Sequence, residues 1–385
     1  MVRSRRSFFL LAALLVAAAL AVAVLLPRTR SQSVAAACRF TPSPTEGEAH
    51  GDLLVRVDGT SPDDVWVVGA TYDGGKGTPL AERWNGSRWE RADVPNVEGV
   101  IAGLHDVVAI TPDDAWAVGS SRGSRGLIQH WDGSAWQMVA SPDAGEGDNE
   151  WLGVTASGPN DVWAVGKRSE GTNYRTLIAH WEGSRWQIVP SPNIGAVHNV
   201  LRDVDARAAD DVWAVGWRLD GTGRYRAMTQ HWNGTSWRLV PTPVTGPGDH
   251  ILAGVAALGR DDVWAVGWVT AGPDGSRALS MHWDGSAWTV IDTPSPGATQ
   301  NQLTAVAAGP AGVFAVGQTA DAEQILRSWI LERTGDTWTR IESPDERDLH
   351  NTLSGVAVTG SGDVWAVGQA LDAKSGYYAH ALHGC

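Results

Sequence analysis

Cysteine and long apolar runs are both scarce in this sequence of 385 residues. Its 2 cysteines, Cys38 and Cys385, leave no third cysteine from which a thioether-type copper site could be built. Residues 8–26 are apolar, and no later run approaches the roughly 20 residues that a membrane-spanning helix needs. These absences exclude that class of copper enzyme and a protein with several membrane spans.

Signature motifs of common catalytic and metal sites are also missing. The sequence contains neither an H-E-x-x-H zinc motif nor a D-x-D-x-D-G calcium loop, and the sialidase arginine motif is absent. We also expect no serine nucleophile elbow of the G-x-S-x-G type. We therefore expect no metal, no cofactor and no catalytic residue that a motif would identify. An enzyme whose catalytic residues are scattered along the chain is kept as an alternative.

Basic residues are outnumbered, with 30 Lys and Arg against 43 Asp and Glu, which gives a net charge of −13. Residues 1–30 hold five of the arginines and no acid, so the remainder of the chain carries −18. A body this acidic repels phosphate backbones and anionic lipid headgroups. We expect no nucleic-acid partner and contact with a membrane only through the N-terminal segment.

The N-terminal segment has the features of an export signal. Arg3, Arg5 and Arg6 precede the 19 uncharged residues 8–26. A cleaved signal has an apolar region of about 7–15 residues, whereas about 20 span a bilayer, and an A-x-A cleavage pattern stands at 35–37. We expect residues 1–37 to be a signal peptide or a membrane anchor, with lipid attachment at Cys38 as a third possibility. The body is extracytoplasmic in each case, secreted or anchored by residues 8–26.

Tryptophan is abundant, and it follows a repeat. Variants of D-V-W-A-V-G are centred on seven positions spaced 47 to 51 residues apart, and 17 of the 21 Trp fall on this phrase or on a second one, H-W-x-G-x-x-W, that trails it. The seven positions are Trp66, Trp116, Trp163, Trp213, Trp264, Phe314 and Trp365. A period near 50 with β-type composition is typical of a propeller, solenoid or array. Seven copies favour a seven-bladed β-propeller.

Each repeat divides into four short antiparallel strands. In the fifth repeat they are expected at 252–257, 263–268, 278–283 and 288–291, joined by Gly- and Asp-rich turns. Four antiparallel strands repeated radially are a propeller blade. We expect small residues at the crowded axis, Trp between blades, and stacking of neighbours to complete the core. The sixth repeat, with Phe314 for Trp and Glu332-Arg333 for His-Trp, is the most divergent.

The two ends of the chain complement each other. The seventh repeat stops at Cys385 before its fourth strand, and residues 38–44 (CRFTPSP) align with the fourth strand of the fourth repeat, 237–243 (WRLVPTP). The N-terminal strand is therefore expected to complete blade 7 and close the ring. This alignment places Cys38 opposite Cys385, and in an oxidising compartment the pair predicts a disulfide. Residues 38–385 form the predicted propeller domain, expected to be a monomer.

These phrases resemble those of Trp-rich bacterial extracytoplasmic β-propeller repeat proteins. The repeat is also similar, more loosely, to tectonin-type lectin repeats, which share a V-W-[AG]-V strand and a G-x-x-W hairpin. The resemblance covers residues 38–385 and implies the propeller fold. It does not imply one function, because propellers host lectins, hydrolases, oxidoreductases and scaffolds.

Two repeated polar positions are expected to be structural. Histidine recurs on the third strand, and symmetry separates the copies too widely for them to share a metal ion. Asp pairs recur in the first turn, where Asp normally accepts hydrogen bonds from nearby backbone N–H groups. The histidines are His130, His180, His231, His282 and His383, and the pairs are Asp63-Asp64, Asp113-Asp114, Asp210-Asp211 and Asp261-Asp262, with Asn160-Asp161 equivalent.

Two further rings of polar residues are expected at the opposite end of the propeller. One is formed by arginines before the third strand, and the other by residues at the start of the innermost strand. The members are Arg125, Arg175, Arg226, Arg277 and Arg327, and Asn149, Asn199, His250, Asn301 and Asn351. Such guanidinium groups either bind a carboxylate ligand or pair with neighbouring acids and stack on Trp.

The loops between the second and third strands vary in length and chemistry, and such loops on a fixed scaffold usually carry binding residues. The candidate binding residues, which combine this end's Tyr and Arg with its polar ring, are Tyr174, Arg175, Tyr225, Arg226, His250, Asn301, Asn351, Tyr377 and Tyr378.

The leading hypothesis is a binding module for a glycan or a cell-envelope protein. The alternatives are a hydrolase with its site in the central funnel and a structural scaffold. Non-repeating acids in the funnel would favour the hydrolase, repeated shallow aromatic pockets a lectin, and a smooth closed funnel the scaffold.

Overall fold

The computed structural model describes residues 38–45, 51–97, 101–123, 126–142, 144–145, 147–243, 246–270, 272, 275–345, 350–372 and 376–385. All of them belong to the unit Cys38–Cys385. The predicted signal or anchor, residues 1–37, lies outside the described residues. Within these ranges, no helix has the length and apolar character needed to cross a membrane.

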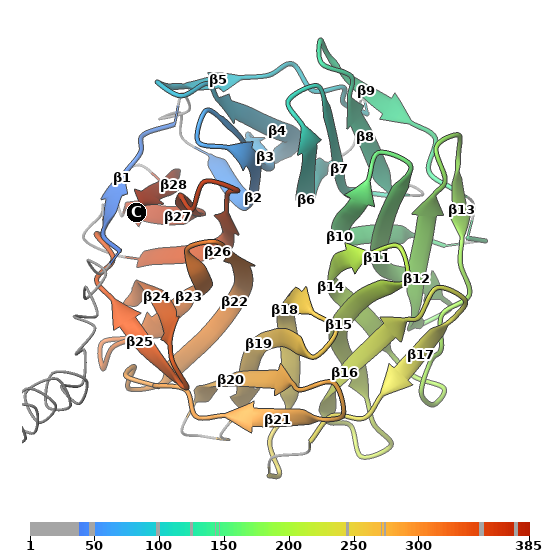
Figure 1. Cartoon of the computed structure of the whole chain (residues 1–385), viewed down its shortest axis with the longest axis vertical. Helices are drawn as coiled ribbons and strands as arrows, with labels where there is room; N and C mark the ends of the chain where they lie inside the picture. The colour runs from blue at the N-terminus through green and yellow to red at the C-terminus, as the bar shows by residue number, and fades with distance from the viewer. Residues whose placement is uncertain are drawn as a thin grey trace, which may run out of the picture. The chain divides into compact units, whose positions relative to one another are not determined.

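Seven antiparallel sheets of four strands each are arranged in a ring, which confirms the seven-bladed propeller (Figure 1). Most innermost strands are rich in small apolar residues, and the second strand of each blade carries a variant of D-V-W-A-V-G. The innermost strands are β2 (Asp52–Ser61), β6 (Ala102–Thr111), β10 (Asn149–Gly158), β14 (Asn199–Ala208), β18 (His250–Gly259), β22 (Gln300–Gly309) and β26 (His350–Val358). The second strands are β3 (Asp64–Asp73), β7 (Asp114–Ser121), β11 (Asp161–Glu170), β15 (Asp211–Leu219), β19 (Asp262–Thr270), β23 (Gly312–Ala320) and β27 (Val364–Asp372).

The outer half of each blade is a hairpin. Its third strands are β4 (Lys76–Trp84), β8 (Leu127–Trp131), β12 (Asn173–Trp181), β16 (Tyr225–Trp232), β20 (Ser276–Trp283), β24 (Leu326–Thr334) and β28 (Gly376–Gly384). Its fourth strands are β5 (Trp89–Arg91), β9 (Trp136–Val139), β13 (Trp186–Ile188), β17 (Trp237–Val240), β21 (Trp288–Ile291), β25 (Thr337–Ile341) and, for blade 7, β1 (Phe40–Pro42). The inner strands of blade 5 are longer than predicted, since their pairing continues past an irregularity between Ala257 and Gly259 to the turn. Farther from the turn it continues through a β-bulge between Leu252 and Gly254.

The glycine of D-V-W-A-V-G is required by this bulge. A Cβ atom on Gly267 would lie 1.9 Å from the carbonyl oxygen of Ile251 on the bulged innermost strand. Near the axis neighbouring blades also approach closely, since a Cβ on Gly254 would lie 3.0 Å from Cα of Ala305 in the next blade. The expectation that small residues belong at the axis is therefore confirmed.

The core lies between the blades, where tryptophans of adjacent sheets meet. Trp213 of blade 4 is 1% exposed, and its ring centroid lies 5.1 Å from Trp283 and 5.3 Å from Trp288 of blade 5. Equivalent clusters are Trp66 with Trp131 and Trp136, Trp116 with Trp181 and Trp186, Trp163 with Trp232 and Trp237, and Trp365 with Trp84 and Trp89. Each blade thus buries its aromatic face against its neighbour.

The repeated His and Asp form a structural unit at the end of the propeller that carries the uniform turns. In blade 2, Nε2 of His130 lies 2.8 Å from Oδ1 of Asp114. The imidazole also packs on Trp116 with ring centroids 4.3 Å apart. The same His–Asp contact is made by His180, His231, His282 and His383. Repetition of this unit confirms the structural interpretation of the histidines.

The two blades without this histidine differ in informative ways. In blade 1, Arg83 replaces it, bonding Asp64 at 2.8 Å through Nε and lying over the Trp66 ring. In blade 6, Gly312 stands in place of the Asp, Phe314 in place of the Trp and Glu332 in place of the His. Since the histidine needs the carboxylate as a partner, the unit is lost as a whole.

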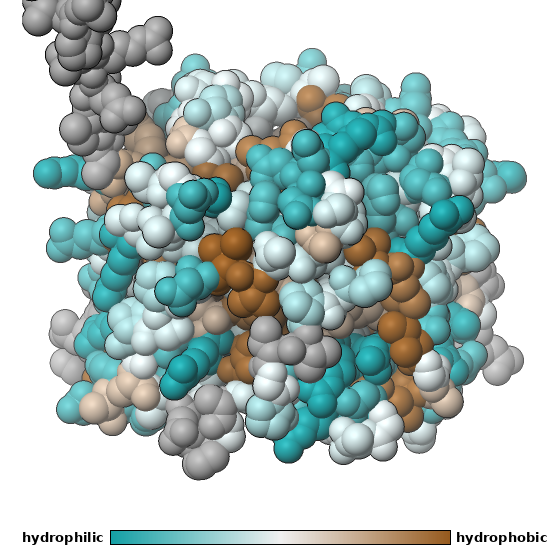
Figure 2. All heavy atoms as spheres, turned by 60° about the horizontal axis from the view of Figure 1, so that its bottom comes forward, coloured by the Kyte–Doolittle hydropathy of each residue, from teal (hydrophilic) through white to brown (hydrophobic). Residues whose placement is uncertain are grey.

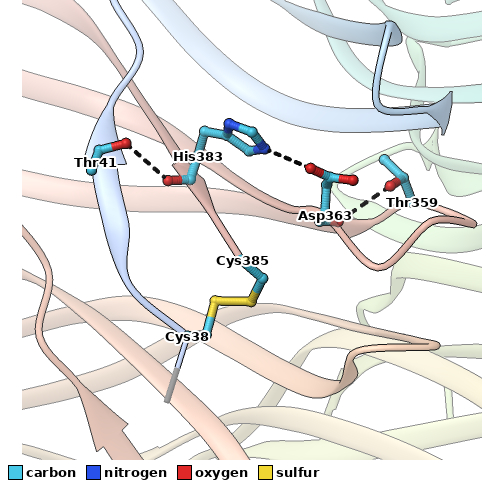
Figure 3. The surroundings of a disulfide bond; sticks show 6 residues. All are labelled: Cys38, Thr41, Thr359, Asp363, His383 and Cys385. Carbon is cyan, nitrogen blue, oxygen red and sulfur yellow. Dashed lines mark hydrogen bonds and ion pairs between the residues drawn. A yellow bond between two sulfur atoms is a disulfide. The ribbon is translucent and has the colours of Figure 1, made fainter. Parts of the chain in front are cut away.

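The ring is closed by β1, which pairs with β28 through Phe40↔Gly384, Thr41↔His383 and Pro42↔Leu382. A disulfide joins Cys38 to Cys385 beside this strand pair (Figure 3). The disulfide takes the place of the Trp-bearing hairpin between the third and fourth strands of other blades. Phe40 of β1 and Phe314 of β23 belong to the same buried cluster. Both the predicted closure and the predicted disulfide are confirmed, and a disulfide fits an oxidising compartment.

Candidate functional site

Tyrosine is confined to one end of the propeller. All five tyrosines lie in or beside the loops between second and third strands, at the end that also carries the connections between blades. Three of them are prominent on the surface, since Tyr72 is 45%, Tyr225 36% and Tyr377 46% exposed. We call this end the variable-loop end. Tyr225 packs edge-on against Trp217 at 4.8 Å, so its ring is supported from one side.

The remaining two tyrosines are more enclosed. Tyr378 is 8% exposed. The ring of Tyr174 is covered by the ammonium group of Lys167, 4.4 Å from its centroid, and packs against His198. The contacts with Lys167 and His198 hold the Tyr174 side chain in place.

The predicted asparagine ring is buried, and two of its members, Asn199 and Asn301, bind the chain itself. The side chain of Asn301 accepts a hydrogen bond from the Gly297 amide and donates to the carbonyls of Gly297 and Ser276. Asn199 does the same with Ile194 and Val197, and Asn351 is fully buried. These amides clamp the connections between blades, so they support the variable-loop end from below.

Three members of the arginine ring pair with acids, as one of the two interpretations expected, whereas Arg277 lines a cavity. Arg175 bonds Glu170 at 2.6 Å, Arg226 bonds Asp220 at 2.7 Å, and Arg327 lies within 4.0 Å of both Asp321 and Asp345. Arg125 lies outside the described residues.

Two of the predicted residues, Arg226 and His250, line one cavity of about 310 Å³. Nη1 of Arg226 lies 3.3 Å from Nδ1 of His250, which is 3% exposed. Asn301 lines a second cavity, of about 540 Å³, beside Arg277. The structure therefore brings some predicted residues together in pairs, but it distributes the whole set over several blades.

A polar cluster in the central channel was missed by the sequence analysis. The channel, a cavity of about 310 Å³, is lined by Arg56 of blade 1, Asp106 of blade 2 and Asp203 of blade 4, with Asp58 and Asp205 further along the same strands. Nε of Arg56 lies 3.8 Å from Oδ1 of Asp106, and its Nη1 donates to the carbonyl of Ser354 at 2.5 Å. Arg56, Asp106 and Asp203 depart from the repeat, because blades 3, 5 and 7 have glycine at the same position. This departure is the sequence feature from which the cluster could have been predicted.

Each of these carboxylates accepts a hydrogen bond from a backbone amide at the unpaired edge of the innermost strand of the next blade. Asp106 accepts from the amide of Val154, and Asp203 from the amide of Val255, both at 2.8 Å. Asp58 and Asp205 accept in the same way from Ala109 and Ala257. A buried edge amide needs such an acceptor. The cluster thus joins blades 1 and 2, 2 and 3, and 4 and 5.

Burial raises the pKa of all four carboxyl groups. It brings the pKa of Asp58 to about 6, that of Asp205 to about 7 and that of Asp106 to about 8, although Arg56 opposes the last shift. The pKa of Asp203 is raised by the same cause. Several of these groups are therefore protonated near neutral pH, which removes much of the repulsion among them.

The propeller should lose stability as the pH rises from about 4.5 to 8. Because the folded pKa values exceed the unfolded value near 3.9, the folded state binds more protons over this range, and the two-unit shift of Asp58 alone is worth about 3 kcal/mol. Below pH 4 the opposite slope is expected, since hydrogen bonds from Ser134 and Ala287 lower the pKa of Asp132 and Asp284, respectively, to about 2. Denaturant unfolding at pH 3, 4.5, 6 and 8 measures both slopes.

Asp205→Asn is the matched variant, because an amide can still accept from Ala257 and donate to Thr155. It should flatten the slope between pH 5 and 8. Stability that increases steadily from pH 4.5 to 8 would contradict the burial of these acids.

One catalytic motif occurs in letters only. Residues 119–123 (GSSRG) match G-x-S-x-G, but the central Ser121 is the last residue of strand β7. In a hydrolase the nucleophile stands on a turn from a strand into a helix, and β7 leads through a turn to strand β8. The motif therefore has no nucleophile geometry.

Comparison with known proteins supports the fold. The structure of YCF48 bound to D1 peptide matches with a TM-score of 0.57 at 14% identity, covering 90% of this chain and 94% of that one. YCF48 from Cyanidioschyzon merolae matches with 0.55 at 16% identity (90% and 98% covered), and a protein of unknown function from Dyadobacter fermentans with 0.53 at 10% (90% and 97%). At these identities the likeness shows the fold alone. No protein-family model and no curated protein matches the sequence.

Proposed function

We propose that residues 38–385 are an extracytoplasmic binding module whose variable-loop end binds a protein of the cell envelope. The observation that carries this proposal is the placement of all five tyrosines at that end, three of them well exposed. Tyr supplies a large rigid contact surface and a hydroxyl at low entropic cost, and it is enriched among residues that dominate binding energy. The disulfide supports the extracytoplasmic location, with residues 1–37 proposed as the export signal or anchor.

The spread of these tyrosines favours a protein over a small glycan. Tyr72 and Tyr377 belong to the adjacent blades 1 and 7, where both main chains hydrogen-bond to Gly51. Tyr225 belongs to blade 4, on the far side of the ring (Figure 1). A ligand that reaches all three must be large. The repeated tryptophans, which could have formed the repeated aromatic pockets that a lectin of this type would need, pack between blades instead.

One side of the molecule is mainly polar. Figure 2 shows hydrophilic side chains over most of that side, with hydrophobic ones gathered in narrow patches between them. Interfaces between proteins that also exist separately have this mixed character. A surface of this kind, together with the three exposed tyrosines, supports a reversible complex.

Tyr225→Ala combined with Tyr377→Ala should weaken binding to the partner at least about tenfold, since one exposed anchor is commonly worth 1–2 kcal/mol. The measurement is capture of solubilised envelope proteins of the source organism on the immobilised propeller, followed by titration of the partner identified. Leu258→Ala is the matched control, because Leu258 is 41% exposed at the opposite end.

Two results would contradict the proposal. One is binding that survives the double Tyr variant and is lost in Leu258→Ala. The other is captured material that resists protease and is destroyed by periodate, which would assign the surface to a glycan.

The alternative of a hydrolase in the funnel has one observation in its favour, the non-repeating acids of the channel. Asp106 and Asp203 are engaged by backbone amides of the next blades, so their contacts are those of structural caps. The hydrolase would become the preferred function if the wild type released new chain ends from envelope polymers and Asp203→Asn did not.

A further inference from the structure

The cavity that contains Arg226 and His250 combines apolar walls with two guanidinium groups. It lies beside the outer edge of blade 4, where β17 leads into the connection to blade 5. Its walls include Ile194, Met228, Leu239, Pro241 and Pro243, and its charged groups are Arg218 and Arg226. At about 310 Å³ the cavity is at the small end of the range for ligand pockets. Among the described residues, no carboxylate lines this cavity.

The two arginines are direct cross-strand neighbours, Arg218 on β15 and Arg226 on β16. Like charges opposite each other in an antiparallel pair are destabilising unless an opposite charge intervenes. Asp220 supplies that charge to Arg226 alone, through a contact of 2.7 Å to Nε. The side chain of Arg218 is half-buried and makes no hydrogen bond or ion pair with any described residue.

Blade 3 contains the same arrangement with the charge satisfied. Arg168 and Arg175 are cross-strand neighbours there, and Glu170 contacts both, with distances of 3.6 Å to Arg168 and 2.6 Å to Arg175. Asp220, in the equivalent position of blade 4, is one methylene shorter. Its other oxygen accepts hydrogen bonds from the turn residues Thr222 and Arg224. Blade 4 therefore lacks the acceptor that its blade 3 counterpart provides internally.

We propose that this cavity binds a small carboxylate with an apolar body. The carboxylate accepts hydrogen bonds from Arg218 and from Arg226, whose Nε already donates to Asp220 and whose Nη1 donates to the carbonyl of Gly248. The ligand thus supplies Arg218 with the acceptor that Glu170 provides to Arg168 in blade 3. Charge-assisted bonds from planar guanidinium groups suit a carboxylate particularly well. The apolar body packs against Met228, Leu239 and Pro241, because free energy is gained when apolar surface of both the ligand and the cavity wall is removed from water.

This site is independent of the protein-binding surface proposed above. Tyr225 and Tyr377 do not line the cavity, and the ligand is a small acid rather than a macromolecule. Either site can therefore fail its test while the other passes.

Isothermal titration of the propeller with hexanoate, hexanamide and inorganic phosphate tests the chemistry. Hexanoate should bind with one site per chain, and hexanamide, which has the same shape without the charge, should bind at least tenfold more weakly. Phosphate, a charge without an apolar body, should also bind at least tenfold more weakly. Equal affinity for hexanoate and hexanamide, or for hexanoate and phosphate, would overturn the proposal, as would the absence of hexanoate binding.

Variants locate the site. Arg218→Gln should weaken hexanoate binding at least tenfold, and Arg218→Lys should weaken it less, since a single ammonium keeps the charge without the planar fork. Arg168→Gln is the matched control in blade 3 and should leave binding unchanged. Arg218→Gln relieves a like-charge pair, so its melting temperature without ligand should equal or exceed that of the wild type. Hexanoate binding that is unchanged in Arg218→Gln, or lost equally in Arg168→Gln, would place the ligand elsewhere.

N-acetyl-L-leucine and glucuronate separate the sources of such a carboxylate. Binding of N-acetyl-L-leucine as tight as that of hexanoate would support an apolar carboxylate that includes the end of a polypeptide. Preference for glucuronate would contradict the apolar body and assign the site to an acidic sugar.

Discussion

Replacing Cys38 and Cys385 together by serine should lower the free energy of unfolding by about 6 kcal/mol on the chain-entropy model. The bond closes a loop with a sequence separation of 347 residues, nearly the whole propeller. Strand β1 is only three residues long, so few other contacts hold it to β28. Urea unfolding of the oxidised wild type and the double variant measures the difference.

The wild type unfolded in dithiothreitol is the control for the serine side chains, because it breaks the same bond without changing the sequence. It should unfold at nearly the same urea concentration as the double variant. Unfolding of oxidised and reduced wild type at the same urea concentration would show that pairing of β1 with β28 closes the ring without the disulfide. Peptide mapping that finds both thiols free, or lipid on Cys38, would contradict the bond itself.

Trp213→Ala should cost about 3–5 kcal/mol, the usual loss for a buried aromatic residue truncated to alanine. Trp213 is 1% exposed and fills the junction between blades 4 and 5 with Trp283 and Trp288. It also supports the imidazole of His231, with ring centroids 4.4 Å apart. The variant loses contacts in two blades at once. Thermal and urea unfolding of purified protein measure the cost.

Trp213→Phe is the matched variant, because Phe314 occupies the same position in blade 6 and is fully buried there. It should cost clearly less than the alanine substitution. An alanine variant that unfolds like the wild type would show that this residue does not fill the junction.

Sequence repetition made the architecture predictable. Seven copies of one pattern allow each strand to be located by alignment, so a local ambiguity in one blade is resolved by the other six. Blade 7 illustrates this, since the strand it lacks was recognised as residues 38–44 by likeness to blade 4. The disulfide followed from the same alignment, because a strand pair places its end residues opposite each other.

Repetition was a poorer guide to the sites. Repetition favoured rings of polar residues, such as the one that includes Asn199 and Asn301, as candidate sites. The side chains of these two residues instead clamp the connections between blades. The channel cluster is formed by residues that break the pattern, such as Arg56, Asp106 and Asp203. Their convergence depends on the bulge in each innermost strand and on the close approach of neighbouring blades.

The sequence by itself determined the blade count, the four strands per blade, the closure by the N-terminal strand and the pairing of Cys38 with Cys385, because local patterns and their spacing contain this information. Only the tertiary structure decided which charges are satisfied. Glu170 reaches both arginines of its blade and Asp220 reaches one, a difference of one methylene that acquires meaning only when the strands are paired. Burial, likewise, is a property of the assembled ring, and burial raises the pKa of Asp106 to about 8.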